Sequence, residues 1–139
     1  MTVAYMKHGI SSHTFVMLIK LLFAFLLCGA AYILLELIWR GRSHISMFLA
    51  AGFASAILCG LFMRYRMPLI AQYALGGIII TAIEFITGYI VNIRLKLNVW
   101  DYSKKRYNLY GQICLSYSLG WATLVLPITA LSNALIKFP

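Results

Sequence analysis

Two of the three acidic side chains in this 139-residue chain lie inside long apolar runs. Glu36 falls late in the first run, and Glu84 falls within the segment 82–86 (AIEFI) of a later one. A charged carboxylate at the middle of a bilayer costs at least about 2.5 kcal/mol, so such residues face a bundle interior, a partner or a cavity. Glu36 and Glu84 are therefore the first candidates for a substrate-binding or ion-binding site.

Glu36 precedes Arg40 by one helical turn. This is the favourable order for an ion pair between residues i and i+4, and the arginine would keep the carboxylate ionised. The same pair could instead be an interfacial contact that only anchors the end of a helix. The sequence leaves both interpretations open.

Glu84 lies ten residues before Arg94, which is about 15 Å along a helix and too deep for a side chain that simply reaches the headgroups. We expect a functional or structurally essential polar contact here, with the proton held by Glu84 or shared with neighbouring amides. Residues on the same helical stripe lead toward the end at which Arg94 lies. They are Thr87, Gly88, Val91 and Asn92.

The third acid, Asp101, stands in the segment Trp100-Asp101-Tyr102-Ser103, which is followed by Asn108 and Gln112. Asp101 could merely complement the positive N-terminal end of a helix, with Trp100 and Tyr102 as anchors at headgroup level. Asn108 and Gln112 could simply bond helices together. If the helices run up and down, all three acids fall in one half of the bundle. The candidate site residues are then Glu36, Arg40, Glu84, Asn92, Trp100, Asp101, Tyr102, Asn108 and Gln112.

We expect no metal and no cofactor at this site. The histidines His8, His13 and His44 form no zinc pattern with one another or with Cys28, Cys59 and Cys114. Three acids are also too few for the carboxylate clusters that gather magnesium around a diphosphate. No residue can be assigned a catalytic role from the sequence.

The elements that must position these residues are apolar helices. The composition is 63% hydrophobic and 11% charged, whereas a soluble domain carries roughly 25% charged residues. Four runs are long enough to supply the roughly 20 residues that cross a bilayer. They predict an all-α bundle of four transmembrane helices in a single domain, residues 1–139, with spans at about 15–39, 45–63, 69–93 and 109–135.

Two of these spans carry small or polar residues at helical spacing. Gly52, Ala56 and Gly60 form a small-xxx-small face, which allows close helix packing in lipid. The fourth span should direct a polar and small stripe toward protein, and its members are Asn108, Gln112, Ser116, Gly120 and Thr123.

The basic residues, which give a net charge of +9, stand at the ends of the apolar runs. This placement indicates contact with anionic lipid headgroups, above all near Lys104, Lys105 and Arg106, and excludes nucleic acid as the expected partner. Seven basic residues flank one face, and Lys7, Arg64, Arg66 and Lys137 flank the other. The excess predicts a multi-pass protein of the cell membrane with the first and third loops cytoplasmic and both termini outside.

The polar segments resemble a known family. The residues that carry the resemblance are Leu35-Glu36-Leu37-Ile38-Trp39-Arg40-Gly41, Glu84 with Gly88, Trp100-Asp101-Tyr102-Ser103, and Asn108 with Gly111-Gln112-Ile113. They are similar to the bacterial family described as "putative ABC-transporter type IV permease". The resemblance implies a small polytopic membrane protein with a polar cluster at Glu36, Glu84, Trp100, Asp101 and Asn108.

Transport is the first functional hypothesis, because intramembrane acids and amides are how membrane proteins pass polar solutes. The chain lacks the Gly-rich phosphate loop with Lys and Ser or Thr, so it cannot hydrolyse ATP itself and an ABC role would require a separate ATPase. Four helices make a small pathway, which predicts a homo-oligomer or a partner membrane subunit. A non-catalytic assembly or regulatory subunit is the alternative. An intramembrane enzyme acting on a lipid or isoprenoid, with Glu84 or Asp101 as acid or base, is less favoured.

Overall fold

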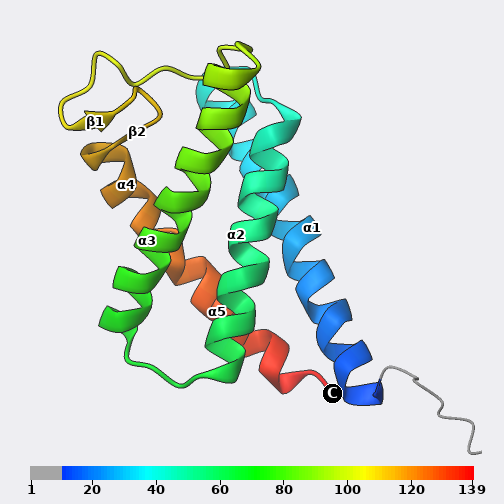
Figure 1. Ribbon diagram of the computed structural model, residues 1–139. Coiled ribbons are helices and arrows are strands. Elements are labelled where there is room, and N and C mark those ends of the chain that lie inside the picture. Colours follow the sequence, from blue (N-terminus) through cyan, green and yellow to red (C-terminus); the bar gives the residue numbers. More distant parts are fainter. Residues whose placement is uncertain (1–10) are drawn as a thin grey trace, which may run out of the picture.

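Four helical spans make up the computed structural model, which describes residues 11–139 (Figure 1). The spans are long and apolar enough to cross a membrane, and the prediction of an all-α, four-helix membrane bundle is confirmed. They consist of α1 (Ser12–Arg40), α2 (Ile45–Arg64), α3 (Leu69–Gly88) continued by the π-helix η1 (Tyr89–Arg94), and α4 (Leu115–Ala122) followed by α5 (Val125–Lys137). Lys7 and His8 lie outside the described residues.

Local sequence signals set the ends of the first three spans. Gly41 ends α1 in the left-handed conformation with φ 69°, and its N–H donates to the Leu37 carbonyl oxygen. His44 begins α2, where its Nδ1 accepts from the backbone N–H of Ser46 at 3.1 Å. Pro68 directly precedes α3, and its carbonyl oxygen accepts from the N–H groups of Ala71 and Gln72.

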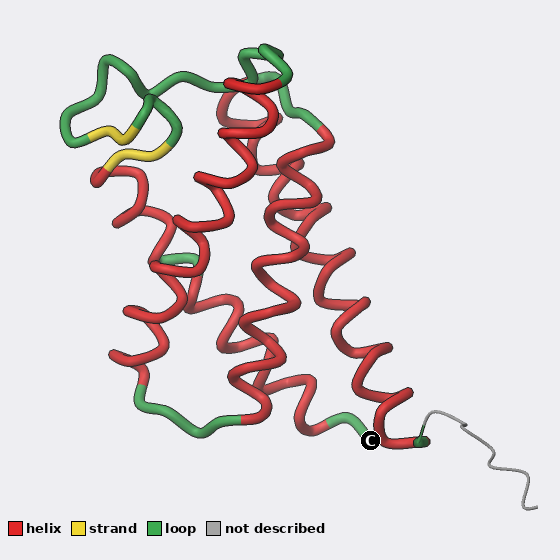
Figure 2. The backbone as a smooth tube through the Cα atoms, viewed as in Figure 1, coloured by secondary structure: helices red, strands yellow, loops and turns green. Residues whose placement is uncertain are grey.

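The fourth span departs from the predicted bounds of 109–135 because it begins at Leu115. Residues 108–114 form a small hairpin instead, in which β1 (Asn108–Leu109) pairs antiparallel with β2 (Ile113–Cys114) (Figure 2). Tyr110 and Gly111 both have positive φ, which a helix does not accommodate. The predicted stripe from Asn108 to Thr123 therefore does not run along one helix.

A break at Thr123 and Leu124 divides the fourth span into α4 and α5. Pro127 explains it, because proline lacks an N–H and its ring collides with the carbonyl group four residues earlier, here that of Thr123. The Thr123 hydroxyl donates to the Gly120 carbonyl oxygen at 2.6 Å, a local bond that also bends helices. The fourth span consequently changes direction halfway through the bundle (Figure 1).

The helices pack unevenly around the core. α1 packs along α2, whereas α4 packs against α3, and α5 against α2 and α3. The small face of α2 lies against α1: a Cβ added at Gly52 would stand 2.8 Å from the Phe25 ring, and one at Gly60 would meet Leu21 at 3.5 Å. The main core cluster is formed by Ala24, Leu58, Cys59, Phe62, Val125, Ile128 and Leu135.

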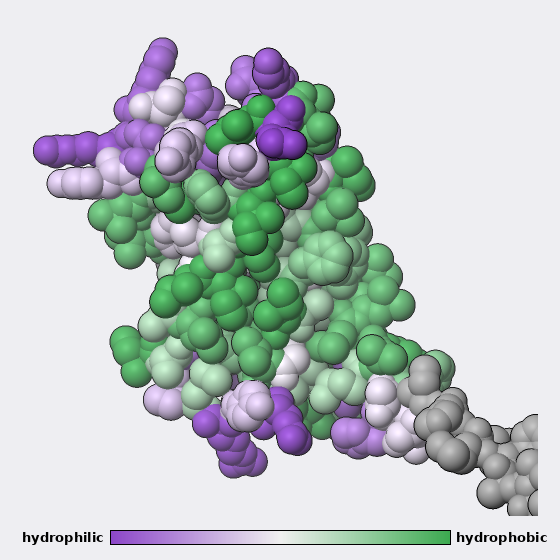
Figure 3. Space-filling model, viewed as in Figure 1, coloured by the Kyte–Doolittle hydropathy of each residue, from purple (hydrophilic) through white to green (hydrophobic). Residues whose placement is uncertain are grey.

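Polar residues gather at the two ends of the bundle, and an apolar band separates them (Figure 3). The loop 41–44 and the long loop 95–114 lie together at one end, opposite the loop 65–68 and the C-terminus (Figure 1). Lys20 belongs to the latter end, because its Nζ donates to the Phe138 carbonyl oxygen at 2.6 Å. Lys20 therefore adds a basic residue to the end of the bundle that holds the loop 65–68. The predicted excess of basic residues at the opposite end, with the loops 41–44 and 95–114, becomes smaller.

Candidate functional site

Glu36 and Arg40 form the ion pair that their spacing predicts. Arg40 Nη1 lies 3.0 Å from Glu36 Oε1, and the Ser43 hydroxyl donates to Glu36 Oε2 at 2.7 Å. Arg40 Nη2 also donates to the Val99 carbonyl oxygen at 3.0 Å. The pair lies at the end of α1, and through Arg40 it also attaches α1 to the long loop 95–114.

Gln112, Asn92 and Trp100 fix the base of the long loop. Asn92 Nδ2 donates to Gln112 Oε1 at 2.9 Å, and the Asn92 Oδ1 accepts from the Val99 N–H at 2.6 Å. The buried Trp100 indole N–H donates to the Gln112 carbonyl oxygen at 2.9 Å. These polar groups satisfy one another, so their geometry assigns them to positioning the loop over the bundle.

Asn108 and Asp101 organise the outer part of the same loop. Asn108 Nδ2 donates to the carbonyl oxygens of Ser103 and Lys105, and its Oδ1 accepts from the Gly111 N–H. Asp101 is exposed and accepts from the Ser103 N–H at 2.8 Å, a bond that lowers the pKa of its carboxyl group. Both residues lie at the end of the bundle rather than beside Glu84.

Gly88 allows the loop to sit tightly on α3, and this contact gives a stability prediction. A Cβ at Gly88 would stand 2.7 Å from Gln112 Oε1 and 2.9 Å from Trp100 Cζ2. We expect Gly88→Ala to lower the free energy of unfolding by about 1–2 kcal/mol, measured by thermal or denaturant unfolding in micelles. Gly120→Ala is the matched control, because no atom of the described residues lies within 4 Å of a Cβ there. Equal stability of the two variants would contradict the tight docking of the loop.

Glu84 is the acid that the bundle leaves incompletely satisfied. Its side chain is buried, and the Tyr102 hydroxyl donates to its Oε1 at 3.1 Å. The second oxygen, Oε2, is buried without a hydrogen-bond partner among residues 11–139. Burial and the adjacent Glu84 carboxyl raise the pKa of Tyr102, so its hydroxyl keeps the proton that it donates.

A row of aromatic side chains connects three elements next to Glu84, and two of its members line the same cavity as Glu84. Tyr32 of α1 lies edge-on to Trp121 of α4, with ring centroids 5.7 Å apart. Tyr117 stacks on Tyr102 of the long loop at 4.7 Å and with an interplanar angle of 9°. Tyr32 is not among the site residues predicted from the sequence, although it stands four residues before Glu36. Trp121 is not among them either, and nothing in the local sequence indicated it as a site residue.

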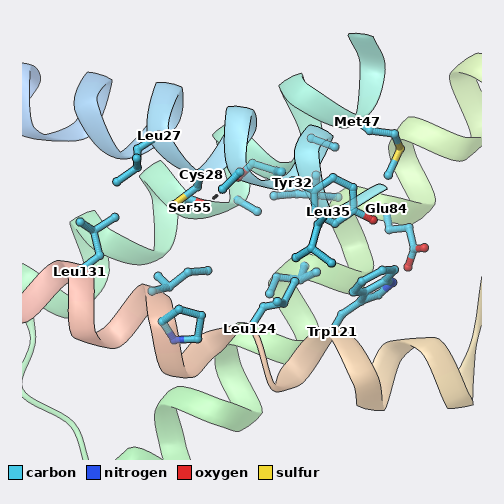
Figure 4. A pocket seen from close by; sticks show the side chains of 18 residues that line it. Leu27, Cys28, Tyr32, Leu35, Met47, Ser55, Glu84, Trp121, Leu124 and Leu131 are labelled. Carbon is cyan, nitrogen blue, oxygen red and sulfur yellow. Dashed lines mark hydrogen bonds between the residues drawn. The ribbon is translucent and has the colours of Figure 1, made fainter. Parts of the chain in front are cut away.

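An apolar cavity of about 370 Å³ opens beside Glu84 (Figure 4). α1 bounds it on one side, and α4 and α5 bound it on the other, with α2 and α3 behind (Figure 4). Leu124 and Pro127 belong to its lining, so the break in the fourth span shapes the cavity. Among the described residues, the lining side chains that contain oxygen atoms are Tyr32, Ser55 and Glu84.

A second, polar cavity of about 720 Å³ lies beneath the long loop. Basic and acidic side chains both line it, and they are Arg40, Arg42, Lys105, Glu36 and Asp101. Predicted site residues Trp100 and Tyr102 also contribute to its wall. Neither Asn92, Asn108 nor Gln112 lines either cavity. Among the described residues, no three His, Cys, Asp or Glu side chains cluster as they would to hold a metal ion.

Residues 45–138 match the family model described as "Putative ABC-transporter type IV". The chain belongs to this family. The match covers α2 through α5, so it includes Glu84 and the long loop, whereas Glu36 and Arg40 of α1 precede it. Searches among curated proteins and among solved structures found no match. The chain is thus a membrane protein of the ABC-transporter type IV family with four spanning helices.

In this member of the ABC-transporter type IV family, the predicted site residues separate into three groups and one single residue. Glu36 and Arg40 join α1 to the loop. Asn92, Trp100, Asn108 and Gln112 hold the loop in shape. Tyr102 makes a direct hydrogen bond to Glu84, and Asp101 is exposed and lines the polar cavity.

Proposed function

We propose that the chain is the membrane-spanning component of a transporter and that a polar site at Glu84 handles its substrate. The observation that carries the proposal is a buried carboxyl group at the wall of a cavity, one oxygen of which has no hydrogen-bond partner among the described residues. An intramembrane acid that only held helices together would have its oxygens satisfied by protein groups. A substrate or its proton can complete the bonding of Glu84 instead.

The family to which the chain belongs supports the same proposal. The sequence contains no phosphate-binding loop, so energy from ATP would have to come from a separate subunit. We further propose that a second copy or a partner membrane subunit completes the pathway. In the proposed orientation, the loops 41–44 and 95–114 face the cytoplasm, and Lys104, Lys105 and Arg106 meet anionic headgroups there.

The test is complementation of a deletion strain by Glu84→Gln. The amide keeps the size of the side chain but cannot hold a charge or release a proton, so we expect activity to fall at least about tenfold. Tyr102→Phe should produce a smaller loss, because it removes one hydrogen bond to Oε1. The readout is the phenotype of the strain at matched expression of each variant.

Thr87→Val is the matched control for these variants. Thr87 lies one turn from Glu84 on the same helix and lines neither cavity. The control should complement fully, and thermal unfolding must show that all variants are folded. If folded Glu84→Gln also complements fully, the carboxyl group has only a packing role. The chain would then be a non-catalytic assembly or regulatory subunit.

A further inference from the structure

We propose that the two cavities form one binding site for an anionic amphiphile, with its hydrocarbon chain in the apolar cavity and its charged headgroup in the polar one. The inference names the substrate class of the transporter and therefore rests on the proposed function. Both volumes, about 370 Å³ and 720 Å³, fall in the range of ligand pockets, which is roughly 300–1,000 Å³.

The two cavities are adjacent because they share part of their walls. Five side chains line both of them, and these are Tyr32, Leu35, Met47, Trp121 and Leu124. The Tyr32 and Trp121 rings meet at 5.7 Å, so they mark the boundary between the apolar and the polar part. Aromatic side chains with one polar end are typical of the level at which hydrocarbon gives way to headgroups.

The apolar cavity suits a hydrocarbon chain. Its lining is almost wholly aliphatic and aromatic, and the hydroxyl of Ser55 is already bonded to the Ala51 carbonyl oxygen at 2.7 Å. Leu27 and Leu35 on its rim are 46% and 54% exposed, so the cavity reaches the apolar surface of the bundle. A lipid chain could therefore move in sideways from the bilayer without leaving an apolar environment.

The polar cavity suits an anionic headgroup. Arg40 is bonded to Glu36 and Val99, but Arg42 and Lys105 have no carboxylate within 4.0 Å in the part of the chain that the structure describes. Of the five charged side chains in the lining, three are basic and two acidic, so the wall has a net positive charge. Basic pockets between transmembrane helices bind anionic headgroups in this way.

The distribution of basic side chains sets the orientation of such a ligand. Among the described residues, none that lines the apolar cavity is basic, so an anionic headgroup there would be buried beside Glu84 with no cation to pair with. An anionic amphiphile therefore has one favourable direction, with the headgroup toward Arg42 and Lys105. A hydroxyl group below the headgroup could also donate to the unpartnered Glu84 Oε2.

Binding of dodecyl phosphate tests the site directly. The full chain is placed in phosphatidylcholine nanodiscs, and equilibrium dialysis measures bound probe after subtraction of empty nanodiscs. We expect saturable binding of dodecyl phosphate and at least about tenfold weaker binding of dodecanol and inorganic phosphate. If dodecanol binds as well, the site recognises only hydrocarbon; if inorganic phosphate binds as well, it recognises only a free anion. Either result would overturn the proposal.

Two variants assign the binding to the two cavities. Arg42→Gln with Lys105→Gln should weaken dodecyl phosphate binding at least about tenfold. The control is Arg66→Gln with Lys137→Gln, which removes the same number of positive charges near the loop 65–68 and the C-terminus, at the opposite end of the bundle, and should leave binding unchanged. Ala51→Leu should also weaken it, because the added carbons fill the apolar cavity. If the Arg66 and Lys137 control loses binding, or if the Arg42 and Lys105 variant keeps it, the headgroup binds somewhere other than the polar cavity.

This experiment is separate from the complementation test. Saturable dodecyl phosphate binding together with full complementation by Glu84→Gln would refute the transport mechanism and leave the amphiphile site standing. Absence of saturable binding together with loss of complementation would refute the amphiphile site and leave a polar transport site at Glu84.

Discussion

Gly76→Ala should destabilise the bundle by about 3 kcal/mol, which is among the largest effects expected of any single substitution. A Cβ at Gly76 would collide with Val125 Cγ2, and Val125 is completely buried. Overpacking of a dense core costs about 1–3 kcal/mol, and a rigid neighbour places the cost at the upper end. Unfolding followed by intrinsic fluorescence in micelles measures the loss.

A double variant shows whether this collision is the cause. Val125→Ala removes the Cγ2 atom, so Gly76→Ala with Val125→Ala should be more stable than the sum of the two single losses implies. Gly60→Ala is the control for adding a methyl group to a helix, because its Cβ would meet Leu21 at an ordinary 3.5 Å. If Gly76→Ala unfolds like Gly60→Ala, then α3 and α5 are not in the close contact described.

The three helical spans up to Arg94 could be predicted from the sequence because one simple requirement defines them. A span needs about 20 apolar residues, and charged residues or proline separate one span from the next. Arg40 and Arg42 mark the end of the first span, and Arg64, Arg66 and Pro68 separate the second span from the third. These boundaries do not depend on which helices touch.

The start of the fourth span could not be predicted in this way. Residues 109–115 are apolar enough to extend a helix. The strand pairing and the positive φ of Tyr110 and Gly111 instead place residues 108–114 in a hairpin. Asn108 and Gln112 contribute side-chain bonds to partners in the loop and in η1. Such tertiary bonds override helical periodicity, and spacing alone does not reveal them.

The candidate site was predictable only where its contacts are local. The Glu36 and Arg40 pair follows from their separation of four residues, and the structure contains it. The bond between Tyr102 and Glu84 spans 18 residues, and the contact between Tyr32 and Trp121 spans 89. Neither leaves a periodic signal, because a loop and a broken helix bring the partners together. The cavities are likewise a product of packing rather than of any motif.

Glu36→Gln is the second substitution with a large expected effect, about 1.5 kcal/mol in the free energy of unfolding. It removes the charge from a buried acceptor, and hydrogen bonds between charged groups contribute about 1.5–3 kcal/mol. The Glu36 side chain is 8% exposed, but the Arg40 side chain that loses its partner is 29% exposed, so the lower end of the range applies. The glutamine can still accept from Ser43, which limits the loss to the pairing with Arg40.

The loss of stability in Glu36→Gln should extend beyond α1, because Arg40 also donates a hydrogen bond to the Val99 carbonyl oxygen. In Glu36→Gln we expect faster amide hydrogen exchange in residues 95–114, while the loop 65–68 at the opposite end exchanges as before. Glu36→Gln with Arg40→Gln should recover part of the stability, because no charge is then left unpaired. If the two losses simply add and exchange in the loop is unchanged, the pair is only an interfacial anchor. Recovery together with faster exchange would establish it as the contact that positions the loop over the polar cavity.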